Sequence, residues 1–242
     1  MLNIQSSTEE IFKTAAQLFV AAACDAIDQK GFFTVALTGG SSPEGLYKLL
    51  SEDQYKNQID WTKVLVFWGD ERWVPLDNEL SNAKMSQEIL LQNVPVLPSN
   101  IFPMYADGVK PEDFASTYST LLHEKLGDDG VMDFILLGMG SDGHTASLFP
   151  GTAVLEEKEK WVAAYYLDAQ KMYRITLTAP FLNKAKKIIV LTFGDAKADA
   201  LKEVLEGDYN PSLYPSQLLK PTKGELLFLV DKKAAKYLSN ND

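Results

Sequence analysis

Apolar and polar positions follow two patterns along the chain, one typical of amphipathic helices and one typical of buried strands. Apolar residues recur at helical spacing over residues 8–30, where we expect Thr8 to cap a helix and Gly31 to end it. Short continuous apolar runs predict strands at 33–37, 64–68, 134–137, 161–166, 173–178, 188–193 and 226–230. Further helices are predicted at 43–50, 81–92, 111–126 and 194–205.

The alternation of these strands and helices predicts an α/β fold. Parallel strands need crossover helices, so we expect three layers, with a largely parallel central sheet covered by helices on both faces. No internal repeat, low-complexity tract or linker interrupts the pattern. Because 242 residues suit one α/β domain, residues 1–242 are expected to form a single domain.

Composition and charge narrow the classes of partner. The formal net charge is -10, from 33 acidic and 23 basic residues, which argues against binding nucleic acid through its phosphates. An anionic substrate would therefore need a local cluster of Arg and Lys side chains. The hydrophobic fraction of 46% is enough for a sizeable core.

The single cysteine, Cys24, excludes an internal disulfide and any cysteine-cluster metal site. We expect it on the apolar face of the first helix, as a small buried residue. No basic segment precedes an apolar run at the N-terminus, and no apolar run is long enough to span a membrane. The chain is therefore expected to be cytoplasmic, without a membrane partner.

A glycine-rich turn, Gly39-Gly40-Ser41-Ser42, follows the first predicted strand and precedes a helix. Backbone N–H groups at the start of a helix bind anions, which makes this turn a candidate phosphate site. The turn lacks the third glycine of the dinucleotide fingerprint and the Gly-Lys-Ser/Thr ending of the P-loop. By itself it is equally compatible with an ordinary tight connection.

Three charged residues, Asp70, Glu71 and Arg72, follow the strand at 64–68 directly. Runs of charge are usually solvated, but ligands of open α/β sheets bind at the carboxyl ends of strands, where this run lies. Two more basic residues stand out, Lys197 at the start of a helix and Arg174 within a strand. A charge in a buried strand is costly unless it is paired, so Arg174 indicates a rim or an anionic ligand.

His144 lies in a second glycine-rich turn, which follows the strand at 134–137 and contains Gly138, Gly140 and Gly143. A histidine at the end of a buried strand is well placed to transfer protons. The alternative is a loop histidine bonded to backbone, and the surrounding glycines favour the catalytic interpretation. The other histidine, His123, is expected near the C-terminal end of a helix, where the dipole favours it.

These segments resemble those of one family, the 6-phosphogluconolactonases, over nearly the whole chain. The resemblance also implies a fold similar to that of the glucosamine-6-phosphate deaminases, which share an Asp-Gly-His motif. Arg72 and the residues Thr145 to Phe149 differ from the deaminase pattern. The segments that carry the resemblance are 37–43, 68–75, 81–82, 137–151, 174–178 and 194–197.

The resemblance implies hydrolysis of 6-phospho-D-glucono-1,5-lactone to 6-phospho-D-gluconate in the oxidative pentose phosphate pathway, without a metal or organic cofactor. His144 would take a proton from water, and a helix N-terminus beside it would keep it neutral. Arg72 would stabilise the oxyanion or hold the substrate from that side. Asp70 would orient Arg72 or His144.

The expected substrate-binding groups come from the same segments. The backbone of Gly39 and Gly40, the hydroxyls of Ser41 and Ser42, Arg174 and Lys197 are candidates for the 6-phosphate. The remaining expected substrate-binding residues are Asn82, Gly140, Asp142 and Gly143.

Two other functions stay open at this point. One is a deaminase or isomerase acting on an amino-sugar phosphate, which Arg72 and Ser147 disfavour. The other is a non-catalytic sugar-phosphate sensor, which the intact His144 motif disfavours. An acyl-enzyme of the Ser-His-Asp type is not expected, because no Gly-x-Ser-x-Gly motif occurs. The sequence leaves the choice between monomer and dimer open.

Overall fold

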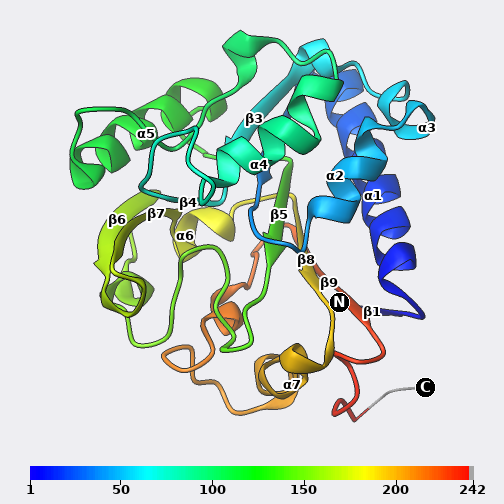
Figure 1. Cartoon of the computed structure of the whole chain (residues 1–242), viewed down its shortest axis with the longest axis vertical. Coiled ribbons are helices and arrows are strands. Elements are labelled where there is room, and N and C mark those ends of the chain that lie inside the picture. Colours follow the sequence, from blue (N-terminus) through cyan, green and yellow to red (C-terminus); the bar gives the residue numbers. More distant parts are fainter. Residues whose placement is uncertain (240–242) are drawn as a thin grey trace.

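A six-stranded parallel sheet forms the centre of the computed structural model and is flanked by helices (Figure 1), which confirms the predicted fold class. Its strand order is β1-β9-β8-β5-β2-β3. The structure describes residues 1–239, so the last three positions of the predicted domain lie outside it. The strands are β1 (Leu2–Gln5), β2 (Phe33–Leu37), β3 (Val64–Trp68), β5 (Phe134–Gly138), β8 (Lys187–Thr192) and β9 (Glu225–Asp231).

The central strands read as continuous apolar runs because helices cover the sheet and leave almost no strand side chain in water. Every residue of β2 is buried, as are the first four of β5. Phe19 of α1 (Thr8–Lys30) packs against Phe33 and Phe134, with ring centroids 5.3 and 5.4 Å away. The core thus fixes the two strands whose ends carry the glycine-rich turns.

The five predicted helices lie close to their predicted positions. α1 is capped by Ser7, whose side chain accepts a hydrogen bond from the Glu10 N–H, so the prediction of Thr8 as cap is wrong by one residue. Gly31 ends α1 at φ 87°, as predicted. The other helices are α2 (Glu44–Ser51), α3 (Asp53–Lys56), α4 (Asn82–Ile89), α5 (Pro111–Leu126), α6 (Ala179–Leu182) and α7 (Ala198–Glu206). The short helices α3 and α6 were not predicted.

A second sheet breaks the expected alternation of strands and helices. Its three antiparallel strands, in the order β4-β7-β6, are β4 (Asp70–Arg72), β7 (Met172–Leu177) and β6 (Val162–Leu167). Strands β6 and β7 form a hairpin whose short connection ends at Lys171, in the left-handed region at φ 53°. The small sheet places Arg72 directly opposite Arg174.

Two further features differ from the sequence expectation. The short strand β1 at the edge of the central sheet pairs with β9 and was not predicted, because four half-exposed residues carry little periodic signal. Cys24 is half-buried on α1, with its Sγ 3.4 Å from the Gln58 carbonyl oxygen. Among the described residues, no helix is both long enough and apolar enough to cross a membrane.

Candidate active site

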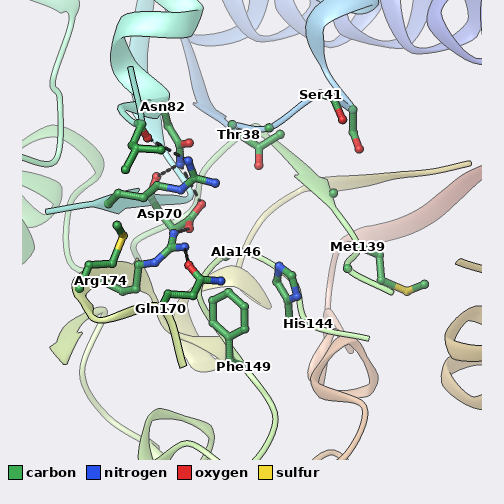
Figure 2. Close-up of a pocket in the computed structure, with 18 of the residues that line it drawn as sticks. Thr38, Ser41, Asp70, Asn82, Met139, His144, Ala146, Phe149, Gln170 and Arg174 are labelled. Carbon is green, nitrogen blue, oxygen red and sulfur yellow. Dashed lines mark hydrogen bonds and ion pairs between the residues drawn. The ribbon is translucent and has the colours of Figure 1, made fainter. Parts of the chain in front are cut away.

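A pocket of about 360 Å³ lies where the carboxyl ends of β2, β3, β5 and β8 meet the small sheet. It gathers every residue expected to touch a ligand except Asp142 and Gly143. Figure 2 shows the labelled residues around this space, with Ser41, Met139 and His144 on one side and Asn82, Asp70 and Arg174 on the other. The expected residues that line it are Gly39, Gly40, Ser41, Ser42, Asp70, Arg72, Asn82, Gly140, His144, Arg174 and Lys197.

The turn after β2 presents backbone to this pocket. Tyr47 anchors its start, since the Tyr47 hydroxyl donates to the Thr38 carbonyl at 2.8 Å and accepts from the Thr38 N–H at 3.0 Å. Gly40 has φ 78°, which favours glycine. A Cβ on Gly39 would lie 1.7 Å from Asn82 Oδ1, so only glycine allows the turn to approach α4 this closely.

The turn after β5 holds His144 against a carboxylate. The Asp142 Oδ1 lies 2.5 Å from His144 Nδ1 and accepts a hydrogen bond from the His144 backbone N–H at 3.1 Å. Burial alone would raise the pKa of Asp142, but the hydrogen bonds and charge of His144 outweigh it and hold that pKa below its ordinary value. An ionised Asp142 can accept a hydrogen bond from a protonated Nδ1 of His144. The lone pair of Nε2 is then available to a ligand.

No helix begins in the described segment that directly follows His144. Turns and an isolated bridge between Thr145 and Leu148 follow it, and the next helical segment is the 3-10 turn Ala153–Glu156. The charged group in direct contact with the imidazole is Asp142. Gly140 leaves room for this arrangement, because a Cβ there would lie 2.1 Å from His144 Nδ1.

Phe149 forms the wall between the imidazole and the guanidinium of Arg174. The His144 ring stacks on Phe149 with centroids 4.1 Å apart, and Arg174 Cζ lies 5.5 Å from the centroid of the same ring. Figure 2 shows Phe149 between His144 and the Gln170–Arg174 pair. An apolar ring here limits the water around His144 and fixes its plane.

Asp70 has partners other than the two that the sequence suggested. The Ser147 hydroxyl donates to Asp70 Oδ2 at 2.5 Å, and Arg174 Nη1 lies 3.7 Å from the same oxygen. The Asn82 amide donates to the Asp70 carbonyl at 2.9 Å. Asp70, only 5% exposed, is therefore expected to orient Arg174 rather than Arg72 or His144.

Arg174 is buried but not unpaired, which corrects the reasoning that a free guanidinium in a strand demands an anionic ligand. Besides Asp70, it donates to the side-chain oxygen of Gln170. Burial lowers the pKa of Arg174, while Asp70 opposes that shift and the nearby Arg72 adds to it. Arg72 donates from Nη1 to the Leu80 carbonyl at 2.9 Å.

Lys197 completes the positive lining. It lies in a short 3-10 turn just before α7, after Gly194, whose N–H donates to Asp231 Oδ1 at 3.0 Å. Burial lowers the pKa of Lys197, with Asp142 opposing. Three cations and one carboxylate, Asp70, thus face the pocket of a protein whose net charge is -10.

Two residues that were expected to contact a ligand, Asp142 and Gly143, do not line the pocket. Asp142 touches His144 instead of the cavity, and the Gly143 carbonyl accepts a hydrogen bond from the Ser216 N–H at 2.9 Å. Eight further residues line the pocket and were not predicted as site residues. Three of them lie at the two strand-end turns, and the other five come from loops and from the small sheet, where no strand-end pattern marks them. The eight residues are Thr38, Leu80, Gly138, Met139, Ala146, Phe149, Gln170 and Met172.

Metal-binding geometry is not built into the described part of the chain. Within residues 1–239, no group of three or more His, Cys, Asp or Glu side chains is arranged to hold a metal ion. The pocket therefore offers a ligand backbone N–H groups, hydroxyls, cationic side chains and one imidazole.

Comparison with known proteins identifies close relatives over the whole fold. The family model described as glucosamine-6-phosphate isomerases/6-phosphogluconolactonase matches residues 6–228. A 6-phosphogluconolactonase of Synechocystis sp. is 37% identical over 88% of both chains. A probable 6-phosphogluconolactonase 2 of Oryza sativa subsp. japonica is 34% identical over 100% of this chain and 91% of its own.

Solved structures agree. The 6-phosphogluconolactonase from Trypanosoma brucei superposes with a TM-score of 0.86 at 26% identity, covering 99% of this chain and 98% of the other. A monomeric glucosamine-6-phosphate deaminase gives a TM-score of 0.83 at 23% identity over 97% and 98% of the two chains, a likeness in fold alone.

Proposed function

The chain belongs to the family of glucosamine-6-phosphate isomerases and 6-phosphogluconolactonases, and on that premise we propose that it hydrolyses 6-phospho-D-glucono-1,5-lactone to 6-phospho-D-gluconate. Relatives that are 34% and 37% identical over most of the chain carry the lactonase name. The observation that supports the reaction most directly is the His144–Asp142 pair, which borders a pocket lined by three cations.

Hydrolysis of a lactone needs a base for water and a group that accepts the developing negative charge. In this proposal His144 Nε2 takes a proton from water as the water oxygen bonds to the lactone carbonyl carbon. Asp142 stabilises the imidazolium that results. The bond from the carbonyl carbon to the ring oxygen then breaks, and the ring oxygen takes the proton back from His144. The product is the open-chain acid, which ionises.

Arg72 is assigned to the reacting end of the substrate. Its guanidinium lines the pocket, with Nη1 tied to the Leu80 carbonyl, so it is fixed before the substrate arrives. A preorganised cation stabilises an oxyanion without reorganisation at the moment of reaction. Asn82 and Gly140, which line the same pocket, are assigned to the sugar hydroxyls.

The 6-phosphate is assigned to the turn after β2 and to Lys197. Gly39 and Gly40 offer backbone N–H groups, and Ser41 and Ser42 offer hydroxyls, at the entry to α2. Arg174 adds positive charge from the opposite side, although Asp70 neutralises part of it. The cluster supplies the local attraction that a protein of net charge -10 otherwise lacks.

An amino-sugar-phosphate deaminase is the second candidate, because a deaminase shares the fold. Such chemistry needs a base to take a proton from carbon, and Asp70 is the one carboxylate among the described residues that lines the pocket. Asp70 is a poor candidate for that role, since Ser147 donates to it and Arg174 pairs with it. The observed partners therefore favour the lactonase.

A coupled assay distinguishes the two candidates. The lactone is generated in situ, and the release of acid is followed above the spontaneous rate. Purified protein is expected to accelerate acid release and to release no ammonia from glucosamine 6-phosphate. Ammonia release without lactone hydrolysis would instead establish the deaminase.

A further inference from the structure

Glu71 is the one charged residue of the Asp70-Glu71-Arg72 run that the proposed mechanism does not use. It is completely buried, at 0% exposure, and does not line the pocket. Because side chains alternate along a strand, Asp70 and Arg72 project from one face of β4 and Glu71 from the other. Burying a carboxylate costs free energy unless hydrogen bonds compensate, so its environment decides what it does.

Four hydrogen bonds converge on the Glu71 carboxylate. Oε1 accepts from the Arg72 N–H at 2.8 Å and the Asn82 N–H at 2.7 Å. Oε2 accepts from the Ala83 N–H at 2.8 Å and the Ser81 hydroxyl at 3.1 Å. All four donors are uncharged groups, and three of them are backbone.

These bonds join β4 to the first turn of α4. Asn82 and Ala83 are the first two residues of α4, and their N–H groups have no partner within the helix. The third N–H, of Lys84, donates to the Ser81 hydroxyl at 3.1 Å. Glu71 of β4 thus caps the N-terminus of α4. The helix dipole favours a negative charge at this end of the helix.

Pocket residues lie on both sides of this junction. Arg72 belongs to β4 and Asn82 to α4, and the Asn82 amide donates in turn to the Asp70 carbonyl at 2.9 Å. The loop between β4 and α4 is closed at its base by Glu71 and along its length by the Arg72–Leu80 bond. Small shifts of this junction would move Arg72 and Asn82 together.

From this geometry we propose that Glu71 is a positioning residue for the lactonase reaction: its carboxylate locks β4 to the start of α4 and so holds Arg72 in its reactive place. This inference rests on the proposed function for its kinetic part. The lock itself is a property of the folded chain and is measurable without substrate.

The conservative variant Glu71→Gln removes the lock with little change in shape. The side-chain oxygen of the glutamine can still accept two hydrogen bonds. Its NH₂ group, however, is itself a donor, and it would face backbone N–H groups that also need an acceptor. A displacement of about 1 Å at a catalytic group costs about 100-fold in rate, so kcat/KM is expected to fall by about 10- to 100-fold, mainly through kcat.

A double-mutant cycle tests whether the effect passes through Arg72. In an Arg72→Ala background, Glu71→Gln is expected to lower kcat by less than about twofold further, because Arg72, through which the effect on kcat passes, is gone. An effect that passes through Asn82 is expected in KM. Equal losses in both backgrounds would overturn the proposal, as would wild-type activity of folded Glu71→Gln.

Asp133→Asn is the matched control, because Asp133 is also a buried carboxylate that accepts backbone and hydroxyl donors, from Thr34, but lies outside the pocket. It is expected to keep wild-type kcat/KM well below its unfolding temperature. Equal activity losses in Glu71→Gln and Asp133→Asn would show a mere effect of stability and overturn the proposal. If Glu71→Gln does not fold, Glu71→Asp replaces it: the shorter side chain keeps the charge but loses the reach, and full activity would overturn the proposal.

A spectroscopic signature separates this inference from the proposed function. The Nε–Hε resonance of Arg72, assigned by comparison with Arg72→Ala, is expected to be a single narrow line in the wild-type protein and to shift or broaden in Glu71→Gln. If the protein proves inactive on the lactone, the proposed function fails. The Arg72 resonance then tests by itself whether Glu71 holds Arg72 in place. An unchanged Arg72 line in Glu71→Gln would then overturn the proposal.

Discussion

At the scale of single residues, the proposed mechanism assigns the proton transfer to His144 and the stabilisation of the resulting imidazolium to Asp142. Asp142 Oδ1 lies 2.5 Å from His144 Nδ1, and in this proposal the imidazole carries its proton on Nδ1 and offers Nε2 as the base. The carboxylate also stabilises the imidazolium that forms when water loses its proton. If this proposal holds, an imidazole that carries its proton on Nε2 would be inactive, just as a protein without the His144 ring would be.

Asp142→Asn tests the tautomer. The new amide can donate a hydrogen bond to Nδ1, which places the ring proton on Nε2 and removes the base. We expect kcat to fall by about 10²–10⁴-fold, as for a lost general base, with little change in KM. Steady-state kinetics in the coupled assay measure both constants.

Asp128→Asn serves as the control, since Asp128 lies 3.8 Å from the ring nitrogen of the other histidine, His123, outside the pocket. It is expected to behave as wild type. An Asp142→Asn enzyme with wild-type kcat would show that the carboxylate plays no part in the reaction.

Lys197 tests the phosphate assignment more cleanly than Arg174, because removal of Arg174 would leave Asp70 buried without its cation. Lys197→Ala is expected to weaken binding of 6-phosphogluconate by about 1.5–3 kcal/mol, the contribution of a hydrogen bond to a charged group. Hydrolysis of unphosphorylated gluconolactone should change little. Calorimetry and parallel kinetics on the two lactones make the comparison.

Lys236→Ala changes the net charge equally but removes a lysine that pairs with Asp195 outside the pocket. It is expected to leave phosphogluconate affinity unchanged. Similar losses on both lactones for Lys197→Ala would place the lysine elsewhere than at the phosphate.

Sequence reasoning identified the residues at the ends of the central strands because a parallel sheet brings those ends to one edge. It did not identify Phe149, Ser147 or Gln170 in their roles. The Ser147–Asp70 bond joins residues that are 77 positions apart in the sequence and meet only in the fold. The His144–Phe149 and Gln170–Arg174 contacts are close in sequence, but each involves a residue of a turn or loop that has no helix or strand period. No local pattern encodes such contacts.

At the scale of elements, the structure depends on how strands begin as well as how they end. Asp133, just before β5, accepts from the N–H and the hydroxyl of Thr34 in β2, at 2.9 and 2.8 Å. Lys30 and Lys186 pair with it at 2.7 and 3.0 Å. One buried carboxylate thus joins two central strands and the end of α1, at the opposite end of the strands from the pocket.

Asp133→Asn is expected to lower the free energy of unfolding by about 1.5–3 kcal/mol at neutral pH, because it weakens hydrogen bonds to a charged group. Denaturant unfolding measures the change. Asp53→Asn, at a carboxylate whose side chain is 84% exposed beside Lys56, is the control and should change stability by less than about 1 kcal/mol.

The same variant predicts a pH dependence. Burial would raise the pKa of Asp133, but Lys30, Thr34 and Lys186 together hold it below its ordinary value of 3.8. A lowered pKa means that the stabilisation is present above the unfolded value of 3.8 and is lost as the pH falls through the folded pKa. The stability gap between wild type and Asp133→Asn should therefore close below about pH 4. A gap that stays constant down to pH 2 would contradict the ion-pair account.

The central strands were predictable as elements because continuous apolar runs occur where both faces of a strand are buried. Strand β4 was not, since it consists of three charged residues that read as a solvated turn. Its pairing with β7 is a tertiary contact. The strands β6 and β7 were predicted as elements, but not their antiparallel pairing in a separate sheet. The small sheet therefore escaped prediction together with its effect, the placement of Arg72 opposite Arg174.

At the scale of the whole molecule, one architectural fact explains the site. Four strands of the parallel sheet end at the same edge, so segments from Gly39 to Lys197 meet although they are far apart in the sequence. The small antiparallel sheet lies beside the central sheet (Figure 1). Its residues that line the pocket are Asp70, Arg72, Met172 and Arg174. The net charge of -10 coexists with a positive pocket because, within residues 1–239, three cationic side chains and only one carboxylate line it.

In the proposed mechanism, His144 activates water for hydrolysis of the phosphorylated lactone. The most direct test measures kcat of folded His144→Asn with lactone generated in situ, beside its affinity for 6-phosphogluconate by calorimetry. We expect kcat of His144→Asn to fall by about 10²–10⁴-fold, while its affinity for 6-phosphogluconate stays near that of the wild type. A His144→Asn enzyme that retains wild-type kcat would contradict it.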